Sequence, residues 1–72
     1  MTTDTMTPED RITQRARVRL EYAERALNNT ALIGHPHAYA GALRHLAACR
    51  AAYEACLRGE FDPLTLAIER MN

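Results

Sequence analysis

The side chains best suited to chemistry in this sequence are those of three histidines and two cysteines. Structural zinc sites use closely paired ligands such as C-x2-C or H-x3-H, and the sequence lacks such pairs. The two cysteines would stand about 10 Å apart along a helix, which exceeds the roughly 7 Å limit between the Cα atoms of a disulfide. We therefore predict no metal site and no cofactor, and we interpret the cysteines as small hydrophobic core residues. The five residues are His35, His37, His45, Cys49 and Cys56.

No combination of residues in the sequence is typical of a catalytic site. The chain contains no serine, no glycine-rich phosphate-binding loop and no pair of carboxylates on a segment that could face a cleft. A chain of 72 residues also struggles to enclose a pocket of the volume that enzymes use. The sequence therefore predicts a protein that is not an enzyme.

Length and charge limit the remaining possibilities. Seventy-two residues suffice for one small domain, and 9 basic residues balance 9 acidic ones, which argues against a non-specific nucleic-acid binder. No run of about 18 apolar residues is present, so we expect no membrane span. Residues 1–10 lack the charged and apolar regions of a secretory signal, and the two cysteines suit a reducing compartment. We expect a cytoplasmic protein.

The composition favours helices over strands. Alanine, arginine, glutamate and leucine dominate the sequence, while tryptophan is absent and Val18 is the only valine. All 9 basic residues are arginine, which we interpret as the codon bias of a GC-rich genome, as in some bacteria and phages. The sequence therefore predicts an all-α protein.

Local start and stop signals divide the chain into three helices. Thr7 and Pro8 suit the N-cap and the first position of a helix, and Asp62 suits the N-cap of another. Gly34 suits a turn and Gly59 suits the end of a helix, because glycine adopts positive φ freely. We predict a frayed arm over 1–6 and a single helical domain over 7–72, with helices at about 7–30, 36–58 and 62–71 and a turn over 31–36.

Apolar residues spaced by three and four positions indicate which sides of these helices form the core. The first two helices, joined by a short turn, should pack as an antiparallel hairpin, and the third should lie across one end of it. The predicted core consists of Ile12, Ala16, Leu20, Ala23, Leu27 and Thr30 from the first helix, Tyr39, Ala42, Leu46, Cys49, Tyr53 and Cys56 from the second, and Leu64, Ala67, Ile68 and Met71 from the third.

A second surface of the first helix combines arginines with a valine and a tyrosine, away from the predicted core. Tyrosine and arginine are enriched in protein interfaces, so we interpret this surface as a site for a protein partner. Two alternatives stay open, namely a solvated arginine surface and a phosphate-binding one. The predicted partner-binding residues are Arg11, Arg15, Val18, Tyr22 and Arg25.

The outer side of the second helix is rich in alanine. Small side chains allow two helices to approach closely, so this strip predicts self-association into a homodimer, which would complete a helical bundle. The alternative is that alanine fills exposed positions because it is the best helix former. The predicted self-association residues are Ala40, Arg44, Ala47, Ala48, Ala51 and Ala55.

These patterns together favour a small non-catalytic interaction module. We expect it to self-associate and to bind a protein partner, as an adaptor, an inhibitor or an assembly subunit. The alternative is a nucleic-acid-associated regulator that uses the arginines of the first helix. A helix-turn-helix DNA reader fits poorly, because the second helix presents alanines where base-contacting polar residues are needed.

Overall fold

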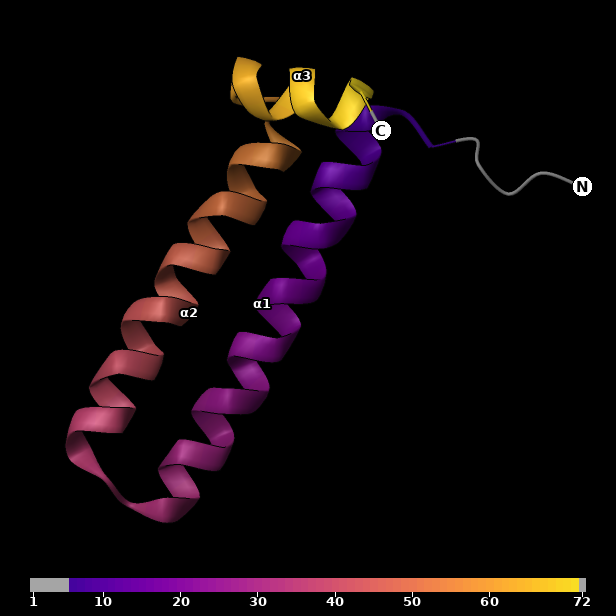
Figure 1. The fold of residues 1–72 in the computed structure, drawn as a ribbon. Coiled ribbons are helices and arrows are strands. Elements are labelled where there is room, and N and C mark those ends of the chain that lie inside the picture. The colour runs from indigo at the N-terminus through magenta and orange to yellow at the C-terminus, as the bar shows by residue number, and fades with distance from the viewer. Residues whose placement is uncertain (1–5, 72) are drawn as a thin grey trace, which may run out of the picture.

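The computed structural model describes residues 6–71, which form three α-helices and no strand. The helices are α1 (Pro8–Ile33), α2 (Pro36–Leu57) and α3 (Pro63–Met71). Helices α1 and α2 lie antiparallel and side by side, and α3 lies at the end of the hairpin opposite the turn (Figure 1). This arrangement confirms the prediction of an all-α helical hairpin with a short third helix. Most of the predicted arm over 1–6 lies outside the described residues.

Two helices begin with side-chain caps that the sequence predicted. At the start of α1, the backbone N–H of Asp10 donates to Oγ1 of Thr7 over 3.1 Å, and the backbone N–H of Thr7 donates to Oδ2 of Asp10 over 3.4 Å. This reciprocal pair is a capping box. Before α3, Oδ2 of Asp62 accepts a hydrogen bond of 3.0 Å from the backbone N–H of Thr65. Both caps satisfy N–H groups that a helix leaves unpaired at its start.

Helix α1 continues one turn beyond its predicted end near residue 30, so the predicted turn over 31–36 is too long. The side chain of Thr30 donates to the carbonyl oxygen of Ala26 over 2.7 Å, which keeps its hydroxyl paired within the helix. The helix ends only where Gly34 adopts φ 82° and donates its N–H to the carbonyl oxygen of Thr30. Gly34 and His35 alone therefore connect α1 to α2.

The hydrophobic core is small and lies midway along the hairpin. Ala23 is 2% exposed, and Leu46 and Cys49 from α2 are 8% exposed. Leu20 and Leu27 pack against these three residues. The centre of the predicted core is therefore confirmed. The core does not extend to the turn, because α3 lies at the other end of the hairpin and no helix covers α1 and α2 there (Figure 1). Tyr39, which was predicted to belong to the core, is therefore exposed.

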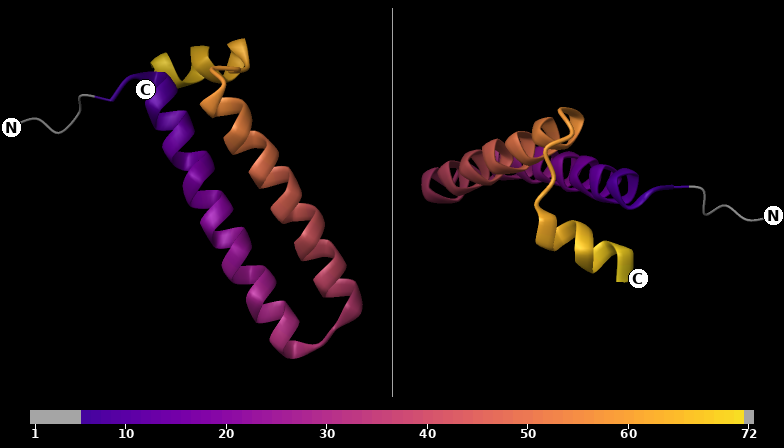
Figure 2. Two further views of the ribbon diagram at one scale, coloured as in Figure 1. Left: turned by 180° about the vertical axis from the view of Figure 1, so that it is seen from behind. Right: turned by 90° about the horizontal axis from the view of Figure 1, so that it is seen from above.

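Helix α3 contacts α1 and not α2, and it lies to one side of the plane that contains the hairpin (Figure 2). Its orientation differs from the prediction. The predicted core side of α3 is turned outward, and Glu69 is buried in its place at 6% exposure. Its neighbour Leu66 is half-buried. The exposed residues that were predicted to be buried are Leu64, Ala67, Ile68 and Met71.

None of the helices between residues 6 and 71 has both the length and the apolar content needed to cross a membrane.

Candidate functional site

A row of arginines runs along one side of α1 and holds α3 in place. Arg11, Arg15 and Arg19 follow one another at intervals of four positions, so they lie on the same side of the helix. Nε of Arg11 donates to Oε2 of Glu69 over 2.8 Å, and Arg15 forms an ion pair with Oε1 of the same carboxylate. Two positive charges therefore compensate the burial of Glu69, as a buried carboxylate requires.

The structure divides the predicted partner-binding residues into two groups. Arg11 and Arg15 contact Glu69, and Arg11 also donates to the carbonyl oxygen of Met6 over 3.0 Å. Val18, Tyr22 and Arg25 are exposed, Tyr22 to 63%. The first group thus has an intramolecular structural role, while the second group faces solvent.

Tyr22 is held by a neighbouring arginine. The guanidinium carbon of Arg25 lies over the ring of Tyr22, 5.7 Å from its centroid. This distance is within the range of a cation–π interaction, which stabilises an exposed aromatic ring by about 0.5–1 kcal/mol. The contact gives the exposed tyrosine a preferred orientation on the surface of α1.

Beside this arginine row, α1 and α2 enclose a shallow groove on the side of the hairpin where α3 lies. Two adjoining hollows form it, and they share Ala16, Arg19 and Ala52. A third hollow, on α1 itself, extends from Arg11 to Tyr22 and includes Val18 and Arg19. We call the first two hollows together the interhelical groove. It is lined by Ile12, Arg15, Ala16, Arg19, His45, Ala48, Cys49, Ala52, Cys56 and Thr65.

Sequence reasoning left Arg19 out of the candidate site, although Arg19 lines all three of these hollows. The spacing of four positions between Arg15 and Arg19 could have indicated that Arg19 lies on the same side of the helix as Arg11 and Arg15. Arg19 is exposed, and no ion pair or hydrogen bond of its side chain is present among residues 6–71. It is therefore the member of the arginine row that can still bind a carboxylate.

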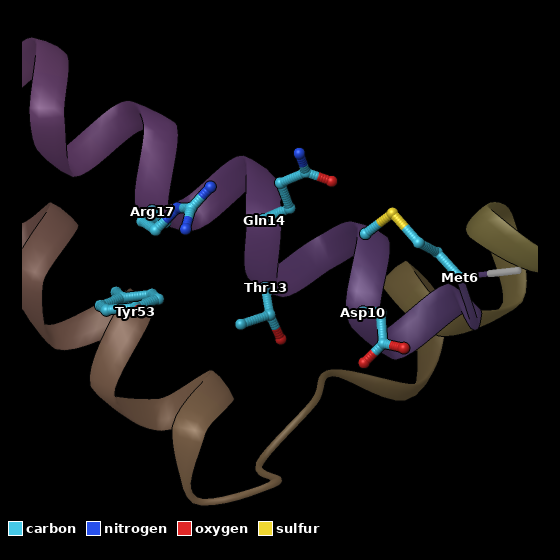
Figure 3. Close-up of a pocket in the computed structure, with 6 residues that line it drawn as sticks. All are labelled: Met6, Asp10, Thr13, Gln14, Arg17 and Tyr53. Atoms are coloured by element: carbon cyan, nitrogen blue, oxygen red, sulfur yellow. The ribbon is translucent and has the colours of Figure 1, made fainter. Parts of the chain in front are cut away.

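The opposite side of the hairpin has a different character. Figure 3 shows a hollow there in which Arg17 from α1 and Tyr53 from α2 point toward the same gap. Arg17 and Arg19 differ by about 200° around the helix axis, so they lie on opposite sides of α1. The only acidic residue in this hollow, Asp10, already caps α1. The hollow therefore offers a mixed polar surface and no nucleophile paired with a base.

The two cysteines lie at the interhelical groove. Cys49 is buried and Cys56 is half-buried, and both are free thiols. Sγ of Cys49 lies 3.6 Å from Nε2 of His45, which is one turn earlier on α2. Among the described residues, no group of three or more histidine, cysteine or acidic side chains is placed to hold a metal ion.

The residues predicted for self-association occupy the outer side of α2 only in part. Arg44, Ala47, Ala48 and Ala51 are exposed. Ala40 and Ala55 are half-buried within their own chain. Ala48, in the middle of the strip, also lines the interhelical groove, so the two surfaces adjoin there.

An exposed ion pair lies directly after the end of α2. Nε of Arg58 donates to Oε2 of Glu60 over 3.0 Å. The hydrogen bond and charge of Arg58 lower the pKa of the Glu60 carboxyl below its usual value. Arg58 thus has a partner in its own chain, next to the predicted self-association strip.

The chain matches no known protein family, no curated protein sequence and no solved structure.

Proposed function

We propose that this chain is a small, non-catalytic, cytoplasmic protein-interaction module that works as an adaptor, an inhibitor or an assembly subunit. The observation that supports this function is that few hydrophobic side chains are buried while many large ones are exposed. Three hydrophobic residues are buried, whereas several large apolar side chains remain at least 63% exposed. Covering exposed apolar side chains with a partner is favourable, because it removes their surface from water. These exposed residues are Leu32, Ile33, Leu57, Leu64 and Met71.

The partner-binding surface of this module is the side of α1 that carries Val18, Tyr22 and Arg25. A tyrosine with a preferred orientation loses less conformational entropy on binding than one that rotates freely, and tyrosine and arginine are among the residues that most often dominate binding energy. Arg11 and Arg15 position α3 at the edge of this surface. Arg11 and Arg15 could contact a partner only while they also pair with the carboxylate of Glu69.

Self-association is the second part of the proposal. The exposed residues Ala47 and Ala51 on α2 present no large side chain, so two copies of α2 could approach closely around a two-fold axis. A pair of hairpins joined in this way would form a bundle of four long helices. Its larger core would offset the small core of a single chain.

A nucleic-acid-associated regulator is the alternative. Phosphate binding needs several free positive charges on one surface, and two arginines of the α1 row already compensate Glu69. The formal net charge of 0 also gives no long-range attraction to a polyanion. Binding to a DNA or RNA duplex with a steep salt dependence would favour this alternative.

The experiment that tests the proposed function compares wild type with Tyr22→Ala in a capture experiment from native lysate. Tyr22 is 63% exposed and points away from the core, so its removal should leave the circular dichroism spectrum nearly unchanged while reducing the captured partner. Tyr39→Ala, which alters a tyrosine near the turn, is the matched control and should retain the partner. Equal capture by all three proteins would contradict the proposal, as would a Tyr22→Ala protein that is unfolded.

A further inference from the structure

Helix α3 shows how a helix that presents a carboxylate binds to the arginine row of α1. It is a short helix that contacts α1 alone, and its one buried side chain is the carboxylate of Glu69 between Arg11 and Arg15. Three of its large apolar side chains, Leu64, Ile68 and Met71, are exposed, while Leu66 is half-buried. The anchoring contact is therefore a carboxylate bound to two arginines of the row.

The same row continues beyond α3 with an arginine that is still available. Arg19 lies one turn after Arg15, is exposed, and forms no ion pair with any residue of the described chain. No acidic residue lines the interhelical groove or the hollow beside Tyr22. This part of the surface is therefore positively charged, although the chain as a whole is neutral.

The groove next to Arg19 has the shape and the chemistry to accept a helix. Ala16, Ala48 and Ala52 line it with small side chains, so a second helix can approach the backbones of α1 and α2 closely. Its lining residues on α2 run from His45 to Cys56, which is about 16 Å along the helix. This length fits about three turns of a bound helix.

We propose that the interhelical groove binds an amphipathic helix of another protein that carries acidic residues along one edge. A carboxylate of the partner pairs with Arg19, as Glu69 pairs with Arg11 and Arg15, and apolar side chains of the partner enter the groove over Ala48 and Ala52. This inference rests on the proposed function and extends its partner-binding surface, because Arg19 lines both the interhelical groove and the hollow that carries Val18 and Tyr22. A second copy of this chain fits the groove less well, because a two-fold axis there would bring the two rows of arginines together.

The test uses fluorescently labelled synthetic helices of about 16 residues, roughly 24 Å long, with leucine on one side and either glutamate or lysine along the edge. Fluorescence anisotropy with the full chain should show that the glutamate peptide binds and the lysine peptide does not. Arg19→Glu should weaken binding of the glutamate peptide by about tenfold or more, and should allow the lysine peptide to bind. Arg17→Glu, on the opposite side of α1, should change the affinity by less than about twofold.

A second pair of variants tests the groove itself. Ala52→Leu places a larger side chain into both hollows and should abolish peptide binding, whereas Ala38→Leu, at an exposed position of α2 outside the groove, should not. Failure of the glutamate peptide to bind, or equal effects of the two members of either pair, would overturn the inference. A dimer that Ala52→Leu dissociates and Ala38→Leu does not would also overturn it, in favour of a second copy.

The result also separates this inference from the proposed function. If no acidic helix binds but capture of a partner still depends on Tyr22, the module binds its partner by another chemistry, and only the inference about the groove fails.

Discussion

Arg11 and Glu69 stand 58 positions apart in the chain, and Nε of the first lies 2.8 Å from Oε2 of the second. This contact joins the first turn of α1 to the last turn of α3. Arg70 lies 3.9 Å from Glu9 at the same junction and adds a weaker, more exposed pair. A network of ion pairs therefore joins the two ends of the described chain, next to the half-buried Leu66.

The first prediction concerns this junction. Glu69→Gln removes the charge that Arg11 and Arg15 share, and it should lower the free energy of unfolding by about 1–3 kcal/mol, because charge-assisted hydrogen bonds are lost while both arginines can still reach water. Amide hydrogen exchange should show that α3 loses protection before α1 and α2. The control Glu60→Gln breaks an exposed pair and should leave α3 protected. Unchanged protection of α3 in Glu69→Gln would contradict the assignment.

The second prediction concerns the core. Leu46 is 8% exposed and packs beside Ala23 and Cys49, so Leu46→Ala should cost about 2–5 kcal/mol and nearly unfold so small a domain. Leu57→Ala on the same helix removes a side chain that is 63% exposed and should have little effect. Thermal melts followed by circular dichroism compare the two. Equal melting temperatures would mean that Leu46 is not in the core.

The third prediction concerns the pH dependence of the exposed pair at the end of α2. Since Arg58 lowers the pKa of Glu60, this carboxyl should titrate below the usual glutamate range in an NMR titration. A lowered pKa favours the folded state above the unfolded pKa, and this contribution disappears as the pH falls through the folded pKa. Arg58→Gln should raise the pKa of Glu60 to its usual value. Glu54→Gln is the control and should leave it lowered, and the reverse pattern would show that the pair does not form in solution.

The fourth prediction concerns the alanine strip of α2. If α2 pairs with its own copy, wild type should sediment as a dimer at tens of micromolar, and Ala51→Glu should be a monomer with unchanged helicity. Ala51 is exposed, so the substitution does not disturb the core of the hairpin. Sedimentation equilibrium decides between the two states. A monomeric wild type, or an Ala51→Glu protein that stays dimeric, would exclude this interface.

The helices and their starting points were predictable from the sequence, because the interactions that define them are local. The cap at Thr7 and Asp10 spans three positions, as does the cap at Asp62 and Thr65. The apolar spacing of α2 likewise identified Leu46 and Cys49 as core residues. The end of α1 was predicted about one turn too early, because Asn28, Asn29 and Thr30 are weak helix formers that the rest of the helix nevertheless accommodates.

The orientation of α3 was decided only by the tertiary structure. Its apolar pattern predicted that Leu64 and Met71 face the hairpin, but at the edge of the hairpin α3 reaches α1 alone, where two arginines compensate a buried carboxylate. No local pattern could reveal this, because the three charges come from opposite ends of the described chain. The interhelical groove could not be predicted from local patterns either. Arg19 comes from α1 and Ala52 from α2, and the two residues lie close together only once the hairpin has formed.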